Sequence, residues 1–257
     1  MINNRRVVGI IQARMTSTRL PGKTMLPLAG KPVLQHIIER LRLSEYIDEV
    51  VVACTTNHTD DILVELCDRL DCKYYRGSED DVMQRVVEAC EKYEADIIVD
   101  VTSDCPCVCG GMADQFIVEL IQHDADYASN VINRTYPRGL DLQVFTYKAL
   151  EQANREVDND VDRSHVSSWI YKNPKTHDHY KLSSITADGF NYSDIRLTLD
   201  TEEDYQLLRL VFESFIDNAF TSRDIERLIK WRSELFEINK HVPQKSYYKE
   251  LVEAYKI

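Results

Sequence analysis

The chain is poor in residues that break regular structure, and it lacks long apolar runs. Only 8 glycines and 7 prolines occur among 257 residues, which excludes collagen-like and low-complexity sequence. No apolar run approaches the ~20 residues that a membrane-spanning helix needs. The opening residues do not read as a secretory signal, because the apolar stretch at 7–11 is short and leads directly into Gln12 and Arg14. We therefore expect a cytoplasmic protein without a membrane partner.

Basic residues are outnumbered by acidic ones, and the number of cysteines is odd. Lys and Arg number 31 against 43 Asp and Glu, and the net charge of -12 disfavours a nucleic-acid partner. A local basic cluster or a metal could still hold a small anion. The 7 cysteines are odd in number and follow no secretion signal, so we expect reduced thiols.

Short β-rich runs alternate with segments of helical period in the first half. The predicted strands are 6–12, 49–54, 72–75 and 96–101, and the predicted helices are 31–43, 59–70 and 78–93, the last with Ser78 as its N-cap. This order predicts an α/β fold with a Rossmann-like, doubly wound and mostly parallel sheet. Ligands of such sheets bind beyond the carboxyl ends of the strands, which indicates the loops after Gln12, Cys54 and Val101.

The second half is less regular, and no linker or internal repeat divides it. Predicted helices cover 111–123, 147–154 and 161–171, predicted strands cover 126–129, 140–145, 181–186 and 196–199, and further helices follow from 201. A chain of 257 residues is long for one compact domain and short for two. We expect one domain over 1–257.

The loop after the first predicted strand, Gln12–Lys23 (QARMTSTRLPGK), concentrates groups that hold phosphate. It carries the cations Arg14, Arg19 and Lys23, hydroxyl residues and a Pro-Gly turn. Backbone N–H groups, hydroxyls and positive charge in one loop meet the needs of a triphosphate. The loop matches neither GxxxxGK(S/T) nor GxGxxG. From composition alone, a solvated basic loop is an equally good interpretation.

The opening QARMTSTRLPGKTMLPLAGKPVLQHIIERL resembles the nucleotide-binding start of the cytidylyltransferase family. That family includes acylneuraminate and 3-deoxy-manno-octulosonate cytidylyltransferases, and the spore coat polysaccharide biosynthesis protein F group is the most similar branch. Further matches follow in order: IDEVVVACTTN, YRGSEDDVMQR, VDVTSDCP, ADYASN, YPRGLDLQVF, RSHVSSWIY and RLTLDTEEDY. The resemblance covers roughly residues 5–212. It implies a fold of the nucleotidyltransferase or nucleotide-diphospho-sugar transferase type, with an inserted acceptor-binding and dimerisation region.

The same resemblance divides the chain and assigns its nucleotide site. It implies a CTP-binding half at 1–125, an acceptor and metal half at 126–215, and C-terminal helices at 216–257. Arg14 and Lys23 would hold the triphosphate, and Arg76 occupies a position where the family contacts base or ribose. The full set implied for nucleotide binding is Gln12, Ala13 (through its backbone), Arg14, Ser17, Arg19, Lys23, Arg76 and Ser103.

Two aspartates far apart in the sequence follow predicted strands. Asp104 lies in VTSDCP and Asp200 in RLTLDTEEDY, so both can reach the same edge of the sheet. Mg²⁺ prefers a few carboxylates together with phosphate oxygens and water. In the resembled family these positions are the metal ligands, and we predict Arg14, Lys23, Asp104 and Asp200 as the catalytic set. The alternative is structural, with Asp200 capping the next helix and Asp104 shaping a turn.

The sequence departs from the family pattern just after Asp104. The group usually reads like GDCPLID, whereas this chain has SDCPCVCGG. The run Cys105, Cys107 and Cys109 could form a thiolate metal site, but no nearby His or Cys-x-x-Cys completes a tetrahedral set. Small apolar filler beside the site is the preferred interpretation. Cys109 stands where the family has an acidic residue, so the acceptor specificity of the family does not carry over to this chain on the resemblance alone.

Acceptor-side candidates come from the second half. They are Asn130, Arg138, Asp141, Gln143 and His165. Arg134 and Arg138 could pair with the carboxylate or phosphate of an acidic acceptor. Equally, Asp141 could hold a turn, and His165 could bond a backbone carbonyl. The general base stays open between a metal-bound water, a carboxylate such as Asp200, and His165.

Two remaining features favour structural interpretations. His177 and His179 form an H-x-H pair that is typical of a surface turn. The tail over 240–257, rich in Tyr and Lys, suits a packed or partner-contacting helix better than a nucleic-acid patch.

The resemblance implies a Mg²⁺-dependent cytidylyltransferase that joins CTP to a sugar acid of the ulosonic or nonulosonic type. The products would be pyrophosphate and a CMP-activated sugar for surface polysaccharide synthesis. One alternative keeps CTP but changes the acceptor to a small phosphate or phosphonate. A second alternative is a catalytically silent nucleotide-binding relative. Related enzymes are commonly dimers, so a homodimer is expected.

Overall fold

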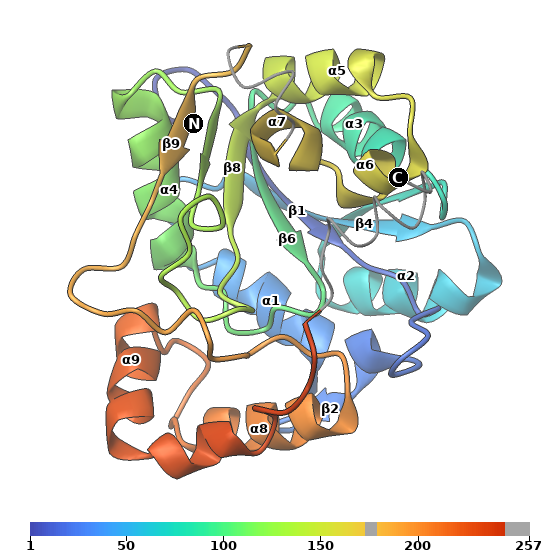
Figure 1. The fold of residues 1–257 in the computed structure, drawn as a ribbon. Coiled ribbons are helices and arrows are strands. Elements are labelled where there is room, and N and C mark those ends of the chain that lie inside the picture. Colours follow the sequence, from blue (N-terminus) through green and yellow to red (C-terminus); the bar gives the residue numbers. More distant parts are fainter. Residues whose placement is uncertain (173–178, 245–257) are drawn as a thin grey trace.

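A mostly parallel sheet organises the chain in the computed structural model, which describes residues 1–172 and 179–244 (Figure 1). Its strand order is β5 (Lys73–Gly77), β4 (Glu49–Thr55), β1 (Val7–Gln12), β6 (Ile97–Thr102), β8 (Gln143–Thr146), β7 (Tyr127–Ser129) and β9 (Leu182–Ser184). The first four strands are mutually parallel, and β8 runs antiparallel to both of its neighbours. The predicted α/β fold is confirmed. A separate small hairpin pairs β2 (Pro27–Leu28) with β3 (Lys31–Pro32).

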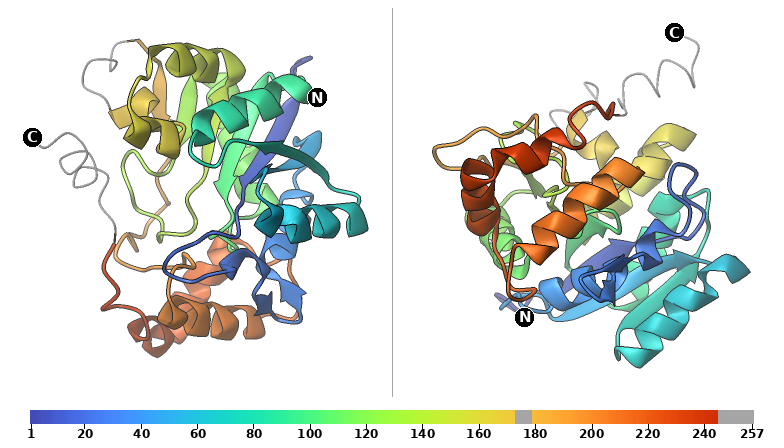
Figure 2. Two further views of the ribbon diagram at one scale, coloured as in Figure 1. Left: turned by 90° about the vertical axis from the view of Figure 1, so that its right-hand side faces the viewer. Right: turned by 90° about the horizontal axis from the view of Figure 1, so that it is seen from below.

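Helices cover both faces of this sheet because the central strands are apolar on both sides. In β1, Val7 and Ile11 face one core cluster while Val8 and Ile10 face the other, and all four are fully buried. Facing the first cluster are α1 (Val33–Leu41), α2 (Asp61–Arg69), α4 (Gly110–Gln122), α8 (Glu202–Glu213) and α9 (Ser222–Trp231). Facing the second are α3 (Val82–Lys92), α5 (Tyr147–Glu156) and α7 (Ser168–Lys172), while α6 (Asp160–His165) packs against α3. Figure 2 shows α8 and α9 at the opposite end of the molecule from α5–α7.

Two predicted helix boundaries are wrong. Helix α3 begins at Val82, because Asp81 is its N-cap and accepts from the amide of Gln84 at 2.9 Å. The hydroxyl of Ser78 instead accepts from the amide of Asp81 at 3.0 Å and shapes the preceding turn. The single helix predicted over 161–171 is divided into α6 and α7, since Val166 between them has φ +59°.

The segment 196–199 is not a strand but a connector between two loops. It has one isolated bridge, from Arg196 to Arg138, and its other backbone bonds go to both sides. Leu197 donates to the carbonyl of Arg138 at 2.6 Å, and Leu199 donates to that of Asp104 at 2.8 Å. Gly139 permits this approach with φ +91°, because a Cβ there would lie 2.3 Å from the carbonyl carbon of Leu197. The segment therefore fixes two site loops relative to each other.

A buried arginine joins the start and the end of the chain. Arg40 of α1 donates to the carbonyls of Val108 at 2.9 Å, Cys107 at 3.0 Å and Phe220 at 2.8 Å, and also to that of Asn218. Its guanidinium lies 3.8 Å from the ring centroid of Phe220. The loop after β6 and the turn before α9 are thus held by one side chain.

Three observations complete the comparison with the predicted elements. In residues 1–172 and 179–244 we find no helix that is long and apolar enough to cross a membrane. His177 and most of the predicted helix over 240–257 lie outside the described residues. The short 3₁₀ segments are Lys23–Met25, His58–Asp60 and Ser233–Glu237.

Candidate active site

The loop after β1 folds back over the end of its own strand. Gly22 adopts φ +70°, and its amide donates to the carbonyl of Met15 at 3.3 Å, which closes the Pro-Gly turn. The hydroxyl of Thr24 donates to the carbonyl of Arg14 at 3.3 Å and lies 3.2 Å from the hydroxyl of Ser103. These bonds hold Lys23, at the start of a 3₁₀ turn, over the carboxyl end of the sheet.

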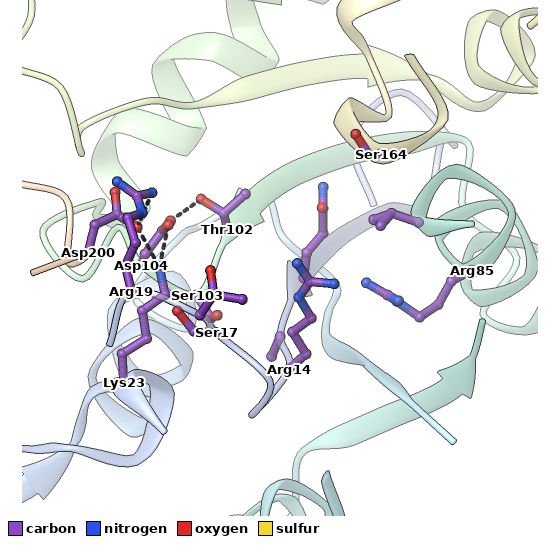
Figure 3. Close-up of a pocket in the computed structure, with 14 residues that line it drawn as sticks. Arg14, Ser17, Arg19, Lys23, Arg85, Thr102, Ser103, Asp104, Ser164 and Asp200 are labelled. Atoms are coloured by element: carbon purple, nitrogen blue, oxygen red, sulfur yellow. Dashed lines mark hydrogen bonds and ion pairs between the residues drawn. The ribbon is translucent and has the colours of Figure 1, made fainter. Parts of the chain in front are cut away.

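A cavity of about 250 Å³ lies at this edge and gathers most of the predicted nucleotide residues (Figure 3). The predicted residues that line it are Gln12, Ala13, Arg14, Ser17, Arg19, Lys23, Ser103, Asp104 and Asp200. Lys23 lies beside Asp104 and Asp200, whereas Arg14 lies apart from them, near Arg85. The topology thus brings the cationic loop of β1, the loop after β6 and the segment before α8 into one cavity.

Lys23 bridges the two predicted metal ligands. Its ammonium nitrogen lies 2.9 Å from a carboxylate oxygen of Asp104 and 2.8 Å from one of Asp200. Burial alone would lower the pKa of Lys23, but the two carboxylates outweigh it and raise that pKa. Burial would likewise raise the pKa of Asp104, whereas Lys23 and the hydroxyl of Thr102 lower it. The structure therefore keeps both charges of the Lys23–Asp104 pair.

The surroundings of Asp200 exclude the capping interpretation. Helix α8 is capped by Thr201, which forms a capping box with Asp204. Asp200 instead accepts from Arg196 at 2.6 Å and pairs with Arg19 at 2.8 Å. Its side chain is 8% exposed and faces the cavity rather than the helix terminus.

The same two carboxylates could hold a divalent cation. Among the described residues no group of three His, Cys, Asp or Glu side chains is placed to bind a metal. Asp104 and Asp200 offer oxygens around one point, and the ammonium of Lys23 stands at that point in place of a cation. Such a pair suits a hard ion such as Mg²⁺, which takes its remaining ligands from phosphate and water.

A second cavity, of about 330 Å³, adjoins the first. Gln12, Arg19, Thr102, Asp104, Ser164 and Asp200 line both. Four predicted acceptor residues line the second one: Arg138, Asp141, Gln143 and His165. Two cavities that meet at the paired aspartates can hold a nucleotide and a second substrate with their reacting atoms close together.

Polar contacts inside the second cavity fix some of these side chains. Arg134 donates to both carboxylate oxygens of Asp141, at 2.5 and 2.8 Å. Gln143 accepts from the hydroxyls of Tyr127 and Ser167. Burial and the neighbouring Arg134 lower the pKa of Arg138, so this half-buried guanidinium would gain from an anion beside it.

Two predicted site residues line neither cavity of the described chain, Arg76 and Asn130. Arg76 donates to Asp61 at 2.7 Å and to the carbonyl of Thr55 at 2.9 Å, so it holds the loop after β4. Asn130 is fully buried and pairs with the backbone of Leu140 and Leu142. The structure therefore gives both residues architectural contacts.

Arg85 lines the first cavity and was not identified from the sequence. It is 2% exposed, and its Nε is the one buried side-chain nitrogen or oxygen in the described part of the chain without a hydrogen-bond partner. Burial and the nearby Arg14 lower the pKa of Arg85. Figure 3 shows the two guanidinium groups on the same side of the cavity. The available signal was a cation on the apolar face of a helix, beside Val82 and Val86.

Further lining residues were also missed. Thr18, Val82, Thr102 and Ser164 line the first cavity, and Asp100, Tyr171 and Lys172 line the second. Asp100 lies within β6, and its charge inside an apolar run was the available signal.

The cysteine run beside Asp104 is buried. Cys105, Cys107 and Cys109 are at most 6% exposed, and Cys107 and Cys109 belong to the core cluster on the α1 and α4 face. Burial raises the pKa of Cys107 to about 12, which keeps it a neutral thiol. These observations favour the interpretation of apolar filler.

Comparisons with known proteins agree with this geometry. A family profile described as cytidylyltransferase matches residues 8–246. The chain belongs to the cytidylyltransferase family. An uncharacterized protein of Methanocaldococcus jannaschii is 34% identical to it, covering 94% of this chain and 98% of its own length. The spore coat polysaccharide biosynthesis protein SpsF of Bacillus subtilis is 32% identical, covering 80% of this chain and 86% of its own.

Solved structures of other proteins are also similar to this cytidylyltransferase. A cytidylyltransferase from Leptospira borgpetersenii is 30% identical with a TM-score of 0.86, over 94% of this chain and 100% of the other. A CMP:2-keto-3-deoxy-manno-octonic acid synthetase complexed with CTP has a TM-score of 0.60 at 18% identity, over 81% and 99% of the two chains. The second likeness shows a shared fold. The resemblance inferred from the sequence is confirmed, and the chain is a nucleotidyltransferase.

Proposed function

We propose that this cytidylyltransferase couples CTP to a small sugar acid of the ulosonic or nonulosonic type. The products are pyrophosphate and a CMP-activated sugar that serves surface polysaccharide synthesis. The observation that carries the proposal is the meeting of Lys23, Asp104 and Asp200 where a cationic cavity joins a second polar cavity. The names of SpsF and of the octonic acid synthetase support the acceptor class.

The nucleotide lies in the first cavity in this proposal. Arg14, Arg19 and Lys23 bind the triphosphate, and the backbone of Ala13 faces the cytosine. Asp104 and Asp200 hold Mg²⁺, which when bound would polarise the α-phosphate and offset charge on the leaving group. The fixed cations then stabilise the charge that develops on pyrophosphate more than they stabilise the substrate.

The acceptor lies in the second cavity. Its hydroxyl oxygen forms a bond to the α-phosphorus while the bond from that phosphorus to the bridging oxygen breaks, and pyrophosphate leaves. The hydroxyl proton passes to a base, for which Asp200 at the junction, His165 in the second cavity and water are the candidates. Arg138, whose pKa is lowered by burial and by Arg134, gains a counter-charge from the carboxylate of the acceptor.

The test is a pyrophosphate-release assay with CTP and a panel of ulosonic acids, polyol phosphates and phosphonates, with magnesium present. We expect release with an ulosonic or nonulosonic acid. The Asp104→Ala variant should lose it, while Asp124→Asn should keep it, because the Asp124 side chain is 99% exposed and Asn tolerates the φ of +47° at this position. Release only with phosphates or phosphonates would establish the alternative acceptor class. CTP binding without release for any acceptor would favour the silent relative.

The proposal includes a homodimer in the cytoplasm, as for related enzymes. Light scattering of the purified protein at micromolar concentration should give about twice the chain mass of 29.9 kDa. A monomer that is fully active in the release assay would remove the dimer from the proposal.

A further inference from the structure

The carboxylates of the candidate metal site are already paired with cations of the chain. One oxygen of Asp200 lies 2.8 Å from Lys23 and 2.8 Å from Arg19, and its other oxygen lies 2.6 Å from Arg196. Asp104 accepts from Lys23 at 2.9 Å and from the hydroxyl of Thr102 at 2.5 Å. Every carboxylate oxygen at this point therefore has a partner.

These partners differ in how firmly they are held. Arg196 is 5% exposed and also donates to both oxygens of Asp204, at 2.9 and 3.0 Å, so it belongs to the framework. Arg19 is 36% exposed and reaches Asp200 from the loop after β1. Lys23 lies on the same loop with a flexible four-carbon stem. Only the two loop cations can leave without opening the fold.

The proposed function requires both the carboxylates and the loop cations to change partners. A divalent ion must approach the carboxylate oxygens to about 2.0–2.1 Å, which is not compatible with an ammonium resting between the same oxygens. The triphosphate also needs Lys23 and Arg19 as its counter-charges. Both requirements are met if the two loop cations move from carboxylate to phosphate as the metal takes the carboxylates.

We propose that Lys23 and Arg19 act as resident counter-cations of Asp104 and Asp200, which makes metal binding and triphosphate binding mutually dependent. This inference rests on the proposed function and adds a loading rule to it. A divalent ion alone must compete with a tethered ammonium and leave it without a partner in a largely buried place. A triphosphate alone must draw Lys23 and Arg19 away, which leaves Asp104 without a cation and Asp200 with Arg196 as its one remaining cation. Together they exchange partners, and by linkage each raises the affinity of the other by the same factor.

The test measures metal affinity without nucleotide, using Mn²⁺ as a paramagnetic probe and following free Mn²⁺ by electron paramagnetic resonance. We expect wild-type protein to bind Mn²⁺ weakly and Lys23→Gln to bind it at least about tenfold more tightly, within the ~5–150-fold range typical of coupled sites. Adding Asp104→Asn to Lys23→Gln should remove that gain, because it takes away one of the two carboxylates.

Arg14→Gln is the matched control. It removes one positive charge from the same cavity without touching either aspartate, since Arg14 pairs with Glu79. Its Mn²⁺ affinity should stay close to that of the wild type. A gain in Arg14→Gln as large as in Lys23→Gln would overturn the proposal, because it would show that Mn²⁺ affinity depends on the total charge of the cavity and not on Lys23 in particular. Equal or weaker Mn²⁺ binding by Lys23→Gln would also overturn it.

Thermal unfolding guards against a folding defect. Mn²⁺ should raise the melting temperature of Lys23→Gln more than that of the wild type, because it replaces the lost counter-charge. None of these measurements involves turnover. A failure of the proposed function would appear as no pyrophosphate from any acceptor with the wild type. A failure of this inference would appear as the same Mn²⁺ affinity in Lys23→Gln and the wild type, while the wild type releases pyrophosphate.

Discussion

The side-chain amide of Gln12 donates to both carboxylate oxygens of Asp100, at 2.7 and 2.8 Å. This pair lies beside the junction of the two cavities, which Gln12 lines on both sides. Asp100 is 1% exposed, and burial raises its pKa to about 7, although Gln12 and Arg85 act in the opposite direction. A carboxyl group that titrates near neutrality therefore lies under the site.

Folding stability should depend on pH through Asp100. Its folded pKa lies above the ordinary value of 3.8, so the folded chain holds a proton that the unfolded chain releases. The resulting stabilisation is present below about pH 4 and is lost as the pH rises to about 7, at ~1.4 kcal/mol per pKa unit. Asp100→Asn should flatten this dependence and be more stable than the wild type at pH 8. Urea unfolding at pH 5 and pH 8 tests this, and an unchanged difference between the two pH values in Asp100→Asn would contradict it.

Arg85 should contribute to nucleotide affinity. A nucleotide acceptor atom that reaches its unpartnered Nε would form a charge-assisted bond worth ~1.5–3 kcal/mol. Arg85→Met should therefore raise KM for CTP by about 10- to 100-fold, with a smaller change in kcat. The free energy of unfolding should fall by no more than about 2 kcal/mol, because the bond from Arg85 to the carbonyl of Ser78 is lost while a desolvated cation is replaced by an apolar side chain of similar length. A variant with unchanged KM but a marked loss of stability would give Arg85 a structural role alone.

The close approach at Gly139 should not tolerate a side chain. Gly139→Ala combines φ +91° with a Cβ 2.3 Å from the carbonyl carbon of Leu197, and we expect a loss of at least about 2 kcal/mol. Gly111→Ala is the control, because nothing lies within 4 Å of its Cβ and the residue is in helix α4. That variant should be neutral or more stable by up to ~1 kcal/mol. Chemical denaturation of both variants decides the point, and equal stabilities would refute the packing argument.

All 7 cysteines should react slowly with thiol reagents in the folded protein. Each is buried and none forms a disulfide. Burial raises the pKa of Cys54 to about 11 and that of Cys107 to about 12, so thiolate is scarce at these two positions at neutral pH. A side-chain bond with Cys67 lowers the pKa of Cys72, so the protection of Cys72 depends on its burial. Labelling with Ellman's reagent should be complete only after unfolding, when 7 thiols react. A rate that increases with a chelator in the folded state would instead indicate a bound metal.

The sequence was most informative about where strands end. Asp104 and Asp200 were predicted to meet because both follow predicted strands, and the structure brings both to Lys23. The stated reason holds for Asp104, which follows β6. It fails for Asp200, because 196–199 is a connector that is placed by its bonds to Arg138 and Asp104. Local patterns cannot specify such a crossing, since it depends on loops that are distant in the sequence.

Side-chain direction was the second limit. Arg76 and Arg85 lie in one short segment, and the resemblance favoured Arg76 for the nucleotide. In the structure Arg76 turns to Asp61 and the backbone of the loop after β4, while Arg85 lines the cavity from one turn inside α3. Helical period indicates which face of α3 is buried, but it cannot say that a cavity interrupts that face at Arg85.

The guanidinium of Arg40 also bears on where this chain can be shortened. Two of its acceptors, the carbonyls of Asn218 and Phe220, belong to the turn that introduces α9. A protein truncated before that turn would retain a buried cation with half of its acceptors removed, directly beneath the loop that carries Asp104. The structure of the Asp104 loop therefore depends on the turn before α9. Removing the last helices for crystallisation or for a minimal enzyme would destabilise that loop.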